Sequence, residues 1–177
     1  RFKKQLLKSF KPVNYKFTPK RSGSKIYNEW SDSVVFIAHE EGSGSGVAIG
    51  RNLILTNFHV INTNKDIFVY KKPGTMTKEA IKSSQAHFVK IKNVNKKYDL
   101  ALLEVTSKNF NVPSIKVKRN ISMQVGDTVH AIGHPLGNYW TYTQGIISQI
   151  RPNHSICFTE KCGENDFLNA DVIQTQT

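Results

Sequence analysis

Apolar residues between positions 30 and 105 come in short runs, each bounded by glycine, asparagine or lysine. Their spacing follows the two-residue period of a strand, without a sustained 3.6-residue period. Strands are predicted at residues 33–38, 45–49, 53–56, 66–70, 86–91 and 100–105. Short strands at regular spacing are typical of an antiparallel barrel or sandwich.

A second group of predicted strands follows a proline-containing linker at residues 109–118. These strands are expected at residues 127–132, 141–150 and 170–174. Three strands cannot close a barrel, so their edges and apolar faces would stay open. We therefore expect that the sequence is a piece of a longer chain, or that another polypeptide completes this second unit.

Residues 1–28 are a basic segment that we expect to be an extended N-terminal arm. The 177 residues carry a net charge of +12, and the excess is concentrated at this end. Residues 1–25 contain no acidic residue and the basic residues Arg1, Lys3, Lys4, Lys8, Lys11, Lys16, Lys20, Arg21 and Lys25. No recognition helix, RNA-binding aromatic strand or zinc-finger spacing accompanies this charge. An acidic protein or a membrane surface is therefore a better-supported partner than a nucleic acid.

A histidine and an aspartate stand at the ends of two predicted strands. His59 follows the apolar residues 53–56, and Asp99 immediately precedes the apolar residues 100–105. A serine hydroxyl needs a neutral imidazole to accept its proton, and the imidazole needs a carboxylate that fixes its tautomer. Side chains held at strand ends are positioned more rigidly than those on loops. The two residues are therefore a candidate base and orienting carboxylate, although each taken singly is more often an ordinary imidazole or a turn aspartate.

Several sequence blocks strengthen this pair as a candidate site. They are Gly44-Ser45-Gly46-Val47, Ile54-Leu55-Thr56-Asn57-Phe58-His59-Val60-Ile61, Asp99-Leu100-Ala101-Leu102-Leu103, Val125-Gly126-Asp127, Ala131-Ile132-Gly133-His134-Pro135-Leu136-Gly137, Thr143-Gln144-Gly145-Ile146-Ile147-Ser148 and Ile173-Gln174-Thr175. In content and order these blocks resemble the trypsin-like (chymotrypsin-fold) serine peptidases of the bacterial HtrA/Deg type. The resemblance covers residues 34–177.

The resemblance implies an all-β fold of two antiparallel β-barrels, the first at residues 29–112 and the second, incomplete, at residues 113–177. It implies a serine endopeptidase that hydrolyses peptide bonds through an acyl-enzyme, with His59 as general base and Asp99 as its orienting carboxylate. The nucleophile of the family lies in a Gly-Asn-Ser-Gly-Gly block that would follow Thr177, so we expect it beyond the given sequence. A polypeptide is the implied substrate, and no metal or organic cofactor is expected.

Other residues with possible chemistry are weaker candidates. Ser43 and Ser45 lie among glycines but do not fit Gly-x-Ser-x-Gly in either frame, and no helix pattern follows them. His134 stands where the family often has asparagine or serine; it either lines the cleft or stabilises a turn, and we favour the turn. Tyr139 and Trp140 are expected to be packing or turn residues.

Cys157 and Cys162 are the two cysteines of the chain, and they form either a short disulfide or two free thiols. The disulfide is the favoured alternative, and with the family resemblance it points to an extracytoplasmic location. No apolar run approaches the roughly 20 residues that span a bilayer. Two other functions stay open: a catalytically inactive, protease-like binding or regulatory module, and an adaptor that binds through the basic arm.

Overall fold

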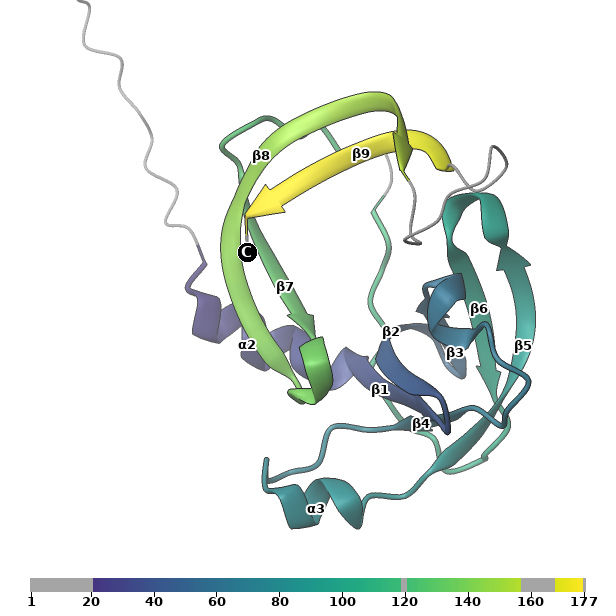
Figure 1. Cartoon of the computed structure of the whole chain (residues 1–177). Coiled ribbons are helices and arrows are strands. Elements are labelled where there is room, and N and C mark those ends of the chain that lie inside the picture. The colour runs from purple at the N-terminus through teal and green to yellow at the C-terminus, as the bar shows by residue number, and fades with distance from the viewer. Residues whose placement is uncertain (1–20, 119–120, 157–167, 177) are drawn as a thin grey trace, which may run out of the picture.

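The computed structural model describes residues 21–118, 121–156 and 168–176, in which two antiparallel sheets carry the fold (Figure 1). The first sheet closes into a barrel with the strand order β1-β2-β3-β6-β5-β4. Its strands are β1 (Val34–His39), β2 (Gly42–Gly50), β3 (Leu53–Thr56), β4 (Phe68–Tyr70), β5 (His87–Asn95) and β6 (Leu100–Val105). Each strand overlaps a predicted one, and the predicted bounds of β3 and β6 are those observed.

Alternating side chains fill this barrel. On β1, Val35 and Ile37 are fully buried, whereas Phe36 between them faces outward and is only partly buried. Ile54 of β3 and Leu103 of β6 are also fully buried. Successive strand residues point to opposite faces, so the two-residue period in the sequence becomes one apolar interior. Each such side chain contributes about 1.5–3 kcal/mol through burial, which makes the barrel a rigid frame for residues at its strand ends.

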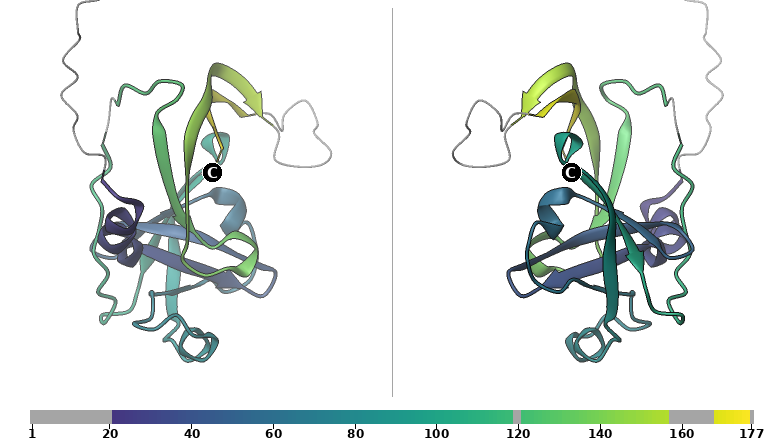
Figure 2. Two further views of the ribbon diagram at one scale, coloured as in Figure 1. Left: turned by 90° about the vertical axis from the view of Figure 1, so that its left-hand side faces the viewer. Right: turned by 90° about the vertical axis from the view of Figure 1, so that its right-hand side faces the viewer.

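The second sheet has the order β7-β8-β9 and consists of β7 (Thr128–Gly133), β8 (Thr141–Ile156) and β9 (Leu168–Gln176). β8 is longer than predicted and arches away from the barrel together with β9 (Figure 1). The side views show these green and yellow strands rising beside the blue strands of the barrel (Figure 2). The expected fold class, all-β with one closed barrel and one incomplete one, is therefore confirmed.

A buried aromatic contact joins the two sheets. The indole N–H of Trp140 donates a hydrogen bond to the carbonyl of Val34 (2.9 Å), and Trp140 is 3% exposed. The ring of His134 packs edge-on against Trp140 at 4.5 Å, and its Nδ1 lies 3.1 Å from Oγ of Ser45 on β2. The packing role expected of Trp140 is confirmed. His134 precedes the 3-10 turn η4 (Pro135–Gly137), but its side chain fills the junction between the sheets rather than capping that turn.

The helix α2 (Gly23–Trp30) corrects the prediction that residues 23–28 are extended. Ser22 caps the helix by accepting a hydrogen bond from a backbone N–H in its first turn. Tyr27 contacts Tyr142 at the start of β8, with ring centroids 6.3 Å apart. Tertiary contact with the second sheet therefore stabilises a segment whose composition is a poor helix signal.

The remaining elements are short and connect the strands. They are η1 (Ser31–Ser33), η2 (Phe58–Ile61), η3 (Lys96–Tyr98) and α3 (Lys78–Lys82). Residues 1–20 of the predicted arm lie outside the described residues. No helix in the described part of the chain is long and apolar enough to cross a membrane.

Replacement of Gly46 by alanine is expected to destabilise the barrel by about 1–3 kcal/mol because it overpacks the interior. A Cβ at Gly46 would lie 2.6 Å from Cγ2 of Ile54 and 2.9 Å from Cδ1 of Ile37. Urea unfolding of the purified variants measures the effect. Gly74→Ala is the matched control, since a Cβ there meets no described atom within 4 Å. Equal losses of stability in the two variants would contradict the packing argument.

Candidate active site

His59 is held close to the end of a buried strand. β3 ends at Thr56, whose hydroxyl donates to the carbonyl of Ser45 on the neighbouring strand β2 (2.8 Å). The chain then turns into η2, and His59 is the second residue of that turn. The barrel core and the Thr56 hydrogen bond thus fix the direction in which the chain leaves the sheet.

Asp99 reaches the same place from the strand that pairs with β3. β3 and β6 are antiparallel neighbours in which Thr56 lies opposite Ala101, so the end of β3 adjoins the start of β6. Asp99 follows η3 in a left-handed conformation (φ 50°, ψ 45°), a region in which aspartate is one of the tolerated residues. Strand pairing therefore brings together two residues that stand 40 positions apart in the sequence.

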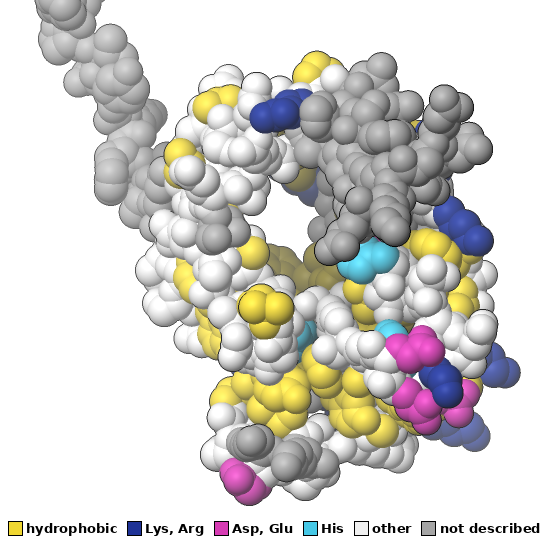
Figure 3. Space-filling model, viewed as in Figure 1, with side chains coloured by type: hydrophobic (Ala, Val, Ile, Leu, Met, Phe, Trp, Pro, Cys, Tyr) yellow, Lys and Arg dark blue, Asp and Glu magenta, His cyan; other side chains and the backbone are white. Residues whose placement is uncertain are grey.

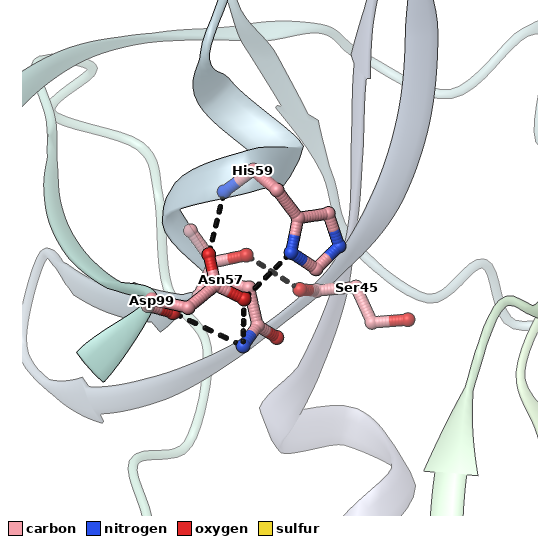
Figure 4. A network of polar contacts seen from close by, with 5 residues as sticks. Ser45, Asn57, His59 and Asp99 are labelled. Atoms are coloured by element: carbon pink, nitrogen blue, oxygen red, sulfur yellow. Dashed lines mark hydrogen bonds and ion pairs between the residues drawn. The ribbon is translucent and has the colours of Figure 1, made fainter. Parts of the chain in front are cut away.

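The side chains of the two residues are in direct contact. Nδ1 of His59 lies 2.6 Å from Oδ2 of Asp99, and the backbone N–H of His59 donates to Oδ1 of the same carboxylate at 2.8 Å (Figure 4). Both carboxylate oxygens are therefore engaged by one residue. This arrangement fixes the rotation of the imidazole ring and places the Nδ1 proton toward Asp99.

A third residue, Asn57, completes the network. Its side-chain Nδ2 lies 3.2 Å from Oδ2 of Asp99 and 3.1 Å from the Asp99 carbonyl oxygen. That carbonyl also accepts the backbone N–H of Phe58 at 3.1 Å. The motif around His59 contains Asn57, but sequence reasoning assigned it no role, because its contact depends on the strand register rather than on its neighbours in the chain.

The two halves of the His59–Asp99 pair differ in exposure. The Asp99 side chain is 10% exposed and the His59 side chain is 60% exposed. A buried carboxylate is costly unless it is paired, and here it receives N–H donors from His59 and Asn57. The result is a fixed negative charge behind an accessible imidazole. That arrangement suits a group that takes and returns a proton, with a carboxylate that orients it.

The alternative serines are not placed near this imidazole by any hydrogen bond in the described structure. Ser45 Oγ contacts His134, accepting its backbone N–H at 2.9 Å, and Ser148 Oγ donates to the carbonyl of Gln174 at 3.0 Å. Ser43 and Ser45 both belong to β2, which is a strand and not a nucleophile elbow. Cys157 and Cys162 lie outside the described residues. In the described part of the chain, no cluster of three or more His, Cys, Asp or Glu residues is arranged to hold a metal ion.

A hollow lies between the barrel and the second sheet, beside the candidate site. Figure 3 shows the molecule open between the arch of the second sheet and the barrel. The cavity on the barrel side measures about 270 Å³ and is lined by Asn57, Leu100, Ser45, Leu55 and Ile132, among others. It therefore adjoins both segments that carry the His59–Asp99 pair.

Comparison with known proteins identifies the family to which the chain is similar. The family model of the trypsin-like peptidase domain matches residues 44–177. The chain is 31% identical over 142 residues to the serine endoprotease DegS of Salmonella typhimurium, covering 77% of this chain and 37% of that protein. It is 35% identical over 107 residues to the mitochondrial serine protease HTRA2 of Drosophila virilis, covering 60% of this chain and 23% of that protein. The chain thus spans little more than a third, or less, of the length of these relatives.

A solved structure supports the fold independently. The crystal structure of Deg5 superposes with a TM-score of 0.65 at 24% identity, covering 86% of this chain and 71% of that chain. At this identity the likeness concerns the fold alone. The family match covers most of the chain, and the relatives include HtrA and DegS proteases as the sequence blocks indicated. The chain belongs to the trypsin-like peptidase family.

Proposed function

We propose that this chain carries the proton-transfer half of a serine endopeptidase site, with His59 as general base and acid and Asp99 as its orienting carboxylate. The observation that carries the proposal is the 2.6 Å contact between Nδ1 of His59 and Oδ2 of Asp99. A carboxylate at Nδ1 holds the neutral ring in the tautomer whose lone pair is on Nε2. Nε2 is then the atom that accepts a hydroxyl proton.

The proposed reaction proceeds through an acyl-enzyme. A serine from a segment that follows Thr177 loses its proton to Nε2 of His59 while its oxygen bonds to the peptide carbonyl carbon. When the tetrahedral intermediate collapses, the C–N bond breaks and the imidazolium returns the proton to the leaving amine. Water then attacks the ester carbonyl with His59 again as base, releasing the carboxylic acid and regenerating the serine. The proton transfers contribute about 10²–10⁴-fold to the rate.

The second sheet supports the proposal that further polypeptide completes this site. Ile146 and Ile150 of β8 and Ile173 of β9 are 43%, 37% and 38% exposed. Ile150 and Ile173 are cross-strand partners, so they form a shared apolar surface. A continuation of this chain, or another chain, would cover that surface and bring the nucleophile.

The nucleophile is tested with a fluorophosphonate probe, which labels an activated serine. The full-length product of the coding sequence is expected to be labelled, and His59→Ala is expected to reduce the labelling rate by at least about 10²-fold, since the general base is lost. An unfolding measurement on both proteins controls for loss of structure. Absence of labelling in the folded wild-type protein would instead favour the non-catalytic binding or regulatory module.

We also propose an extracytoplasmic location and a surface-binding role for the basic residues of the arm. The family resemblance supports the location. The favoured disulfide between Cys157 and Cys162 supports it as well, because disulfides persist in oxidising compartments outside the cytosol. The absence of acidic residues from positions 1–25 supports binding to an anionic surface. Titration of free thiols in the native protein tests the proposed location, because two reactive thiols would remove the disulfide that supports it. Unchanged binding to anionic vesicles after deletion of residues 1–20, which leaves α2 intact, would refute the proposed surface binding.

A further inference from the structure

The Asn57 side chain contacts Asp99 at two different atoms. Nδ2 lies 3.1 Å from the backbone oxygen and 3.2 Å from Oδ2 of the carboxylate. Both contacted atoms can only accept hydrogen bonds, so the amide nitrogen, and not the amide oxygen, must face Asp99. The two hydrogens of one amide group are therefore sufficient for both contacts.

The carboxylate oxygen that Asn57 contacts is the one that His59 uses. Oδ2 lies 2.6 Å from Nδ1 of His59 and 3.2 Å from Nδ2 of Asn57, whereas Oδ1 accepts the backbone N–H of His59. Rotation of the carboxylate about its Cβ–Cγ bond would break these contacts together. The Asn57 contact therefore opposes a rotation of the carboxylate that would turn the lone pair of Oδ2 away from the imidazole.

Asn57 also acts on the backbone of Asp99. The left-handed conformation at Asp99 is sparsely populated by residues other than glycine, and such conformations persist where surrounding contacts impose them. The Asp99 carbonyl accepts two donors from the segment before His59, namely Nδ2 of Asn57 and the backbone N–H of Phe58. The backbone turn that aims the carboxylate and the carboxylate itself are thus held by the same amide.

We propose that Asn57 is a positioning residue that holds the Asp99 carboxylate in the orientation required by His59. The inference rests on the proposed function of the His59–Asp99 pair. Asn57 and His59 extend from β3, and Asp99 lies immediately before β6, so the first barrel supplies this positioning from its own segments. The base and its carboxylate are therefore pre-organised in residues 57–99, before a nucleophile is added.

The test is the proton NMR signal of His59 Nδ1–H in the full-length protein. A proton held between imidazole and carboxylate is protected from exchange with water, and the expected effect of Asn57→Ala is faster exchange. Hydrogen bonds to charged groups are each strong enough that losing one shifts an equilibrium by about tenfold or more. We expect at least that increase in exchange rate, with an unchanged amide spectrum elsewhere in the barrel.

Two further variants make the result specific. Asn62→Ala removes an exposed asparagine at the other end of η2 and is expected to leave the Nδ1–H exchange rate unchanged. Asn57→Ser retains a residue that favours a helix start but withdraws the amide, so it replaces the alanine variant if that protein does not fold. It is expected to give the same faster exchange.

The outcomes separate positioning from ordinary stabilisation. If Asn57→Ala lowers the unfolding free energy but leaves Nδ1–H exchange within twofold of wild type, the proposal is overturned. It is also overturned if Asn62→Ala accelerates the exchange equally. The measurement needs no nucleophile, so failure of the full-length protein to react with the fluorophosphonate would refute the peptidase proposal without deciding this one.

Discussion

Replacement of Asp99 by asparagine is expected to lower the peptidase kcat/KM of the full-length protein by about 10⁴-fold, while the barrel stays folded. The change is nearly isosteric, so the large effect comes from hydrogen-bond chemistry. The carboxylate accepts at both oxygens, Oδ1 from the His59 backbone N–H and Oδ2 from Nδ1. An asparagine side chain has a single acceptor oxygen and cannot serve both contacts.

Either orientation of that asparagine harms the site. If its oxygen stays on the His59 backbone N–H, its NH₂ group faces Nδ1, which must then be unprotonated. The ring proton moves to Nε2, where the hydroxyl proton has to go, and the base is lost. If the amide is turned over, its NH₂ group faces the backbone N–H of His59 and two donors oppose each other. In the first arrangement the new NH₂ group also faces Nδ2 of Asn57, but that side chain can rotate away, whereas the backbone N–H of His59 cannot. The first arrangement is therefore the better tolerated, and it gives a folded protein with the wrong tautomer.

Cleavage of a fluorogenic peptide, followed at several concentrations, measures the loss. Asp66→Asn is the control, because Asp66 is an exposed carboxylate whose loss leaves the His59–Asp99 contacts intact. Urea unfolding of both variants separates a chemical effect from a loss of structure. Retention of most of the wild-type rate by a folded Asp99→Asn variant would contradict the assigned orienting role.

Much of the fold was predictable because alternation in a half-buried strand is enforced by the core. β3 and β6 have the expected bounds because their inward residues, such as Ile54 and Leu103, are fully buried, and a shift by one residue would expose them. The pairing of β3 with β6 then places His59 against Asp99. The sequence blocks identified the two residues as a candidate pair. The register between β3 and β6 explains why their side chains are in contact.

Other features were beyond sequence reasoning because they depend on tertiary contacts. The Asn57 amide meets Asp99 only after β3 and β6 have paired, and neither residue carries a local signal of that contact. His134 is buried between the two sheets beside Ser45, which is 89 positions away, so the residues next to His134 in the sequence give no sign of this contact. α2 was missed for the same reason, since its packing against Tyr142 compensates for weak helix propensity.

The unfolding free energy is expected to fall as the pH is lowered from 6.5 toward 4, and His134 should account for about 3 kcal/mol of that loss. Burial lowers the pKa of His134 from 6.5 to about 4, because the charged ring would be desolvated. Its Nε2 is buried and has no hydrogen-bond partner among the described residues. Phe36 and Trp140 pack against the ring, with centroids 5.2 Å and 4.5 Å away.

The sign follows from proton binding in the two states. The pKa of His134 is lower in the folded protein than in the unfolded chain, so between pH 6.5 and 4 the unfolded chain binds the proton more strongly. Acid therefore favours unfolding, by about 2 kcal/mol at pH 5 and about 3 kcal/mol at pH 4 relative to neutral pH. Above about pH 7.5 this residue gives almost no pH dependence, because it is then neutral in both states.

Urea unfolding at pH 7.5 and pH 5 of wild type and His134→Asn isolates this contribution. The asparagine keeps a polar group near Ser45 but does not titrate, so the variant should lose about 2 kcal/mol less stability between the two pH values. His87 supplies a background that both proteins share, since burial and then nearby Lys71 lower its pKa as well. If wild type and variant lose equal stability between the two pH values, His134 binds its proton as readily in the folded protein as in the unfolded chain. That outcome would contradict the prediction. A smaller loss in the variant would identify the contact between the sheets as an acid-sensitive point of the fold.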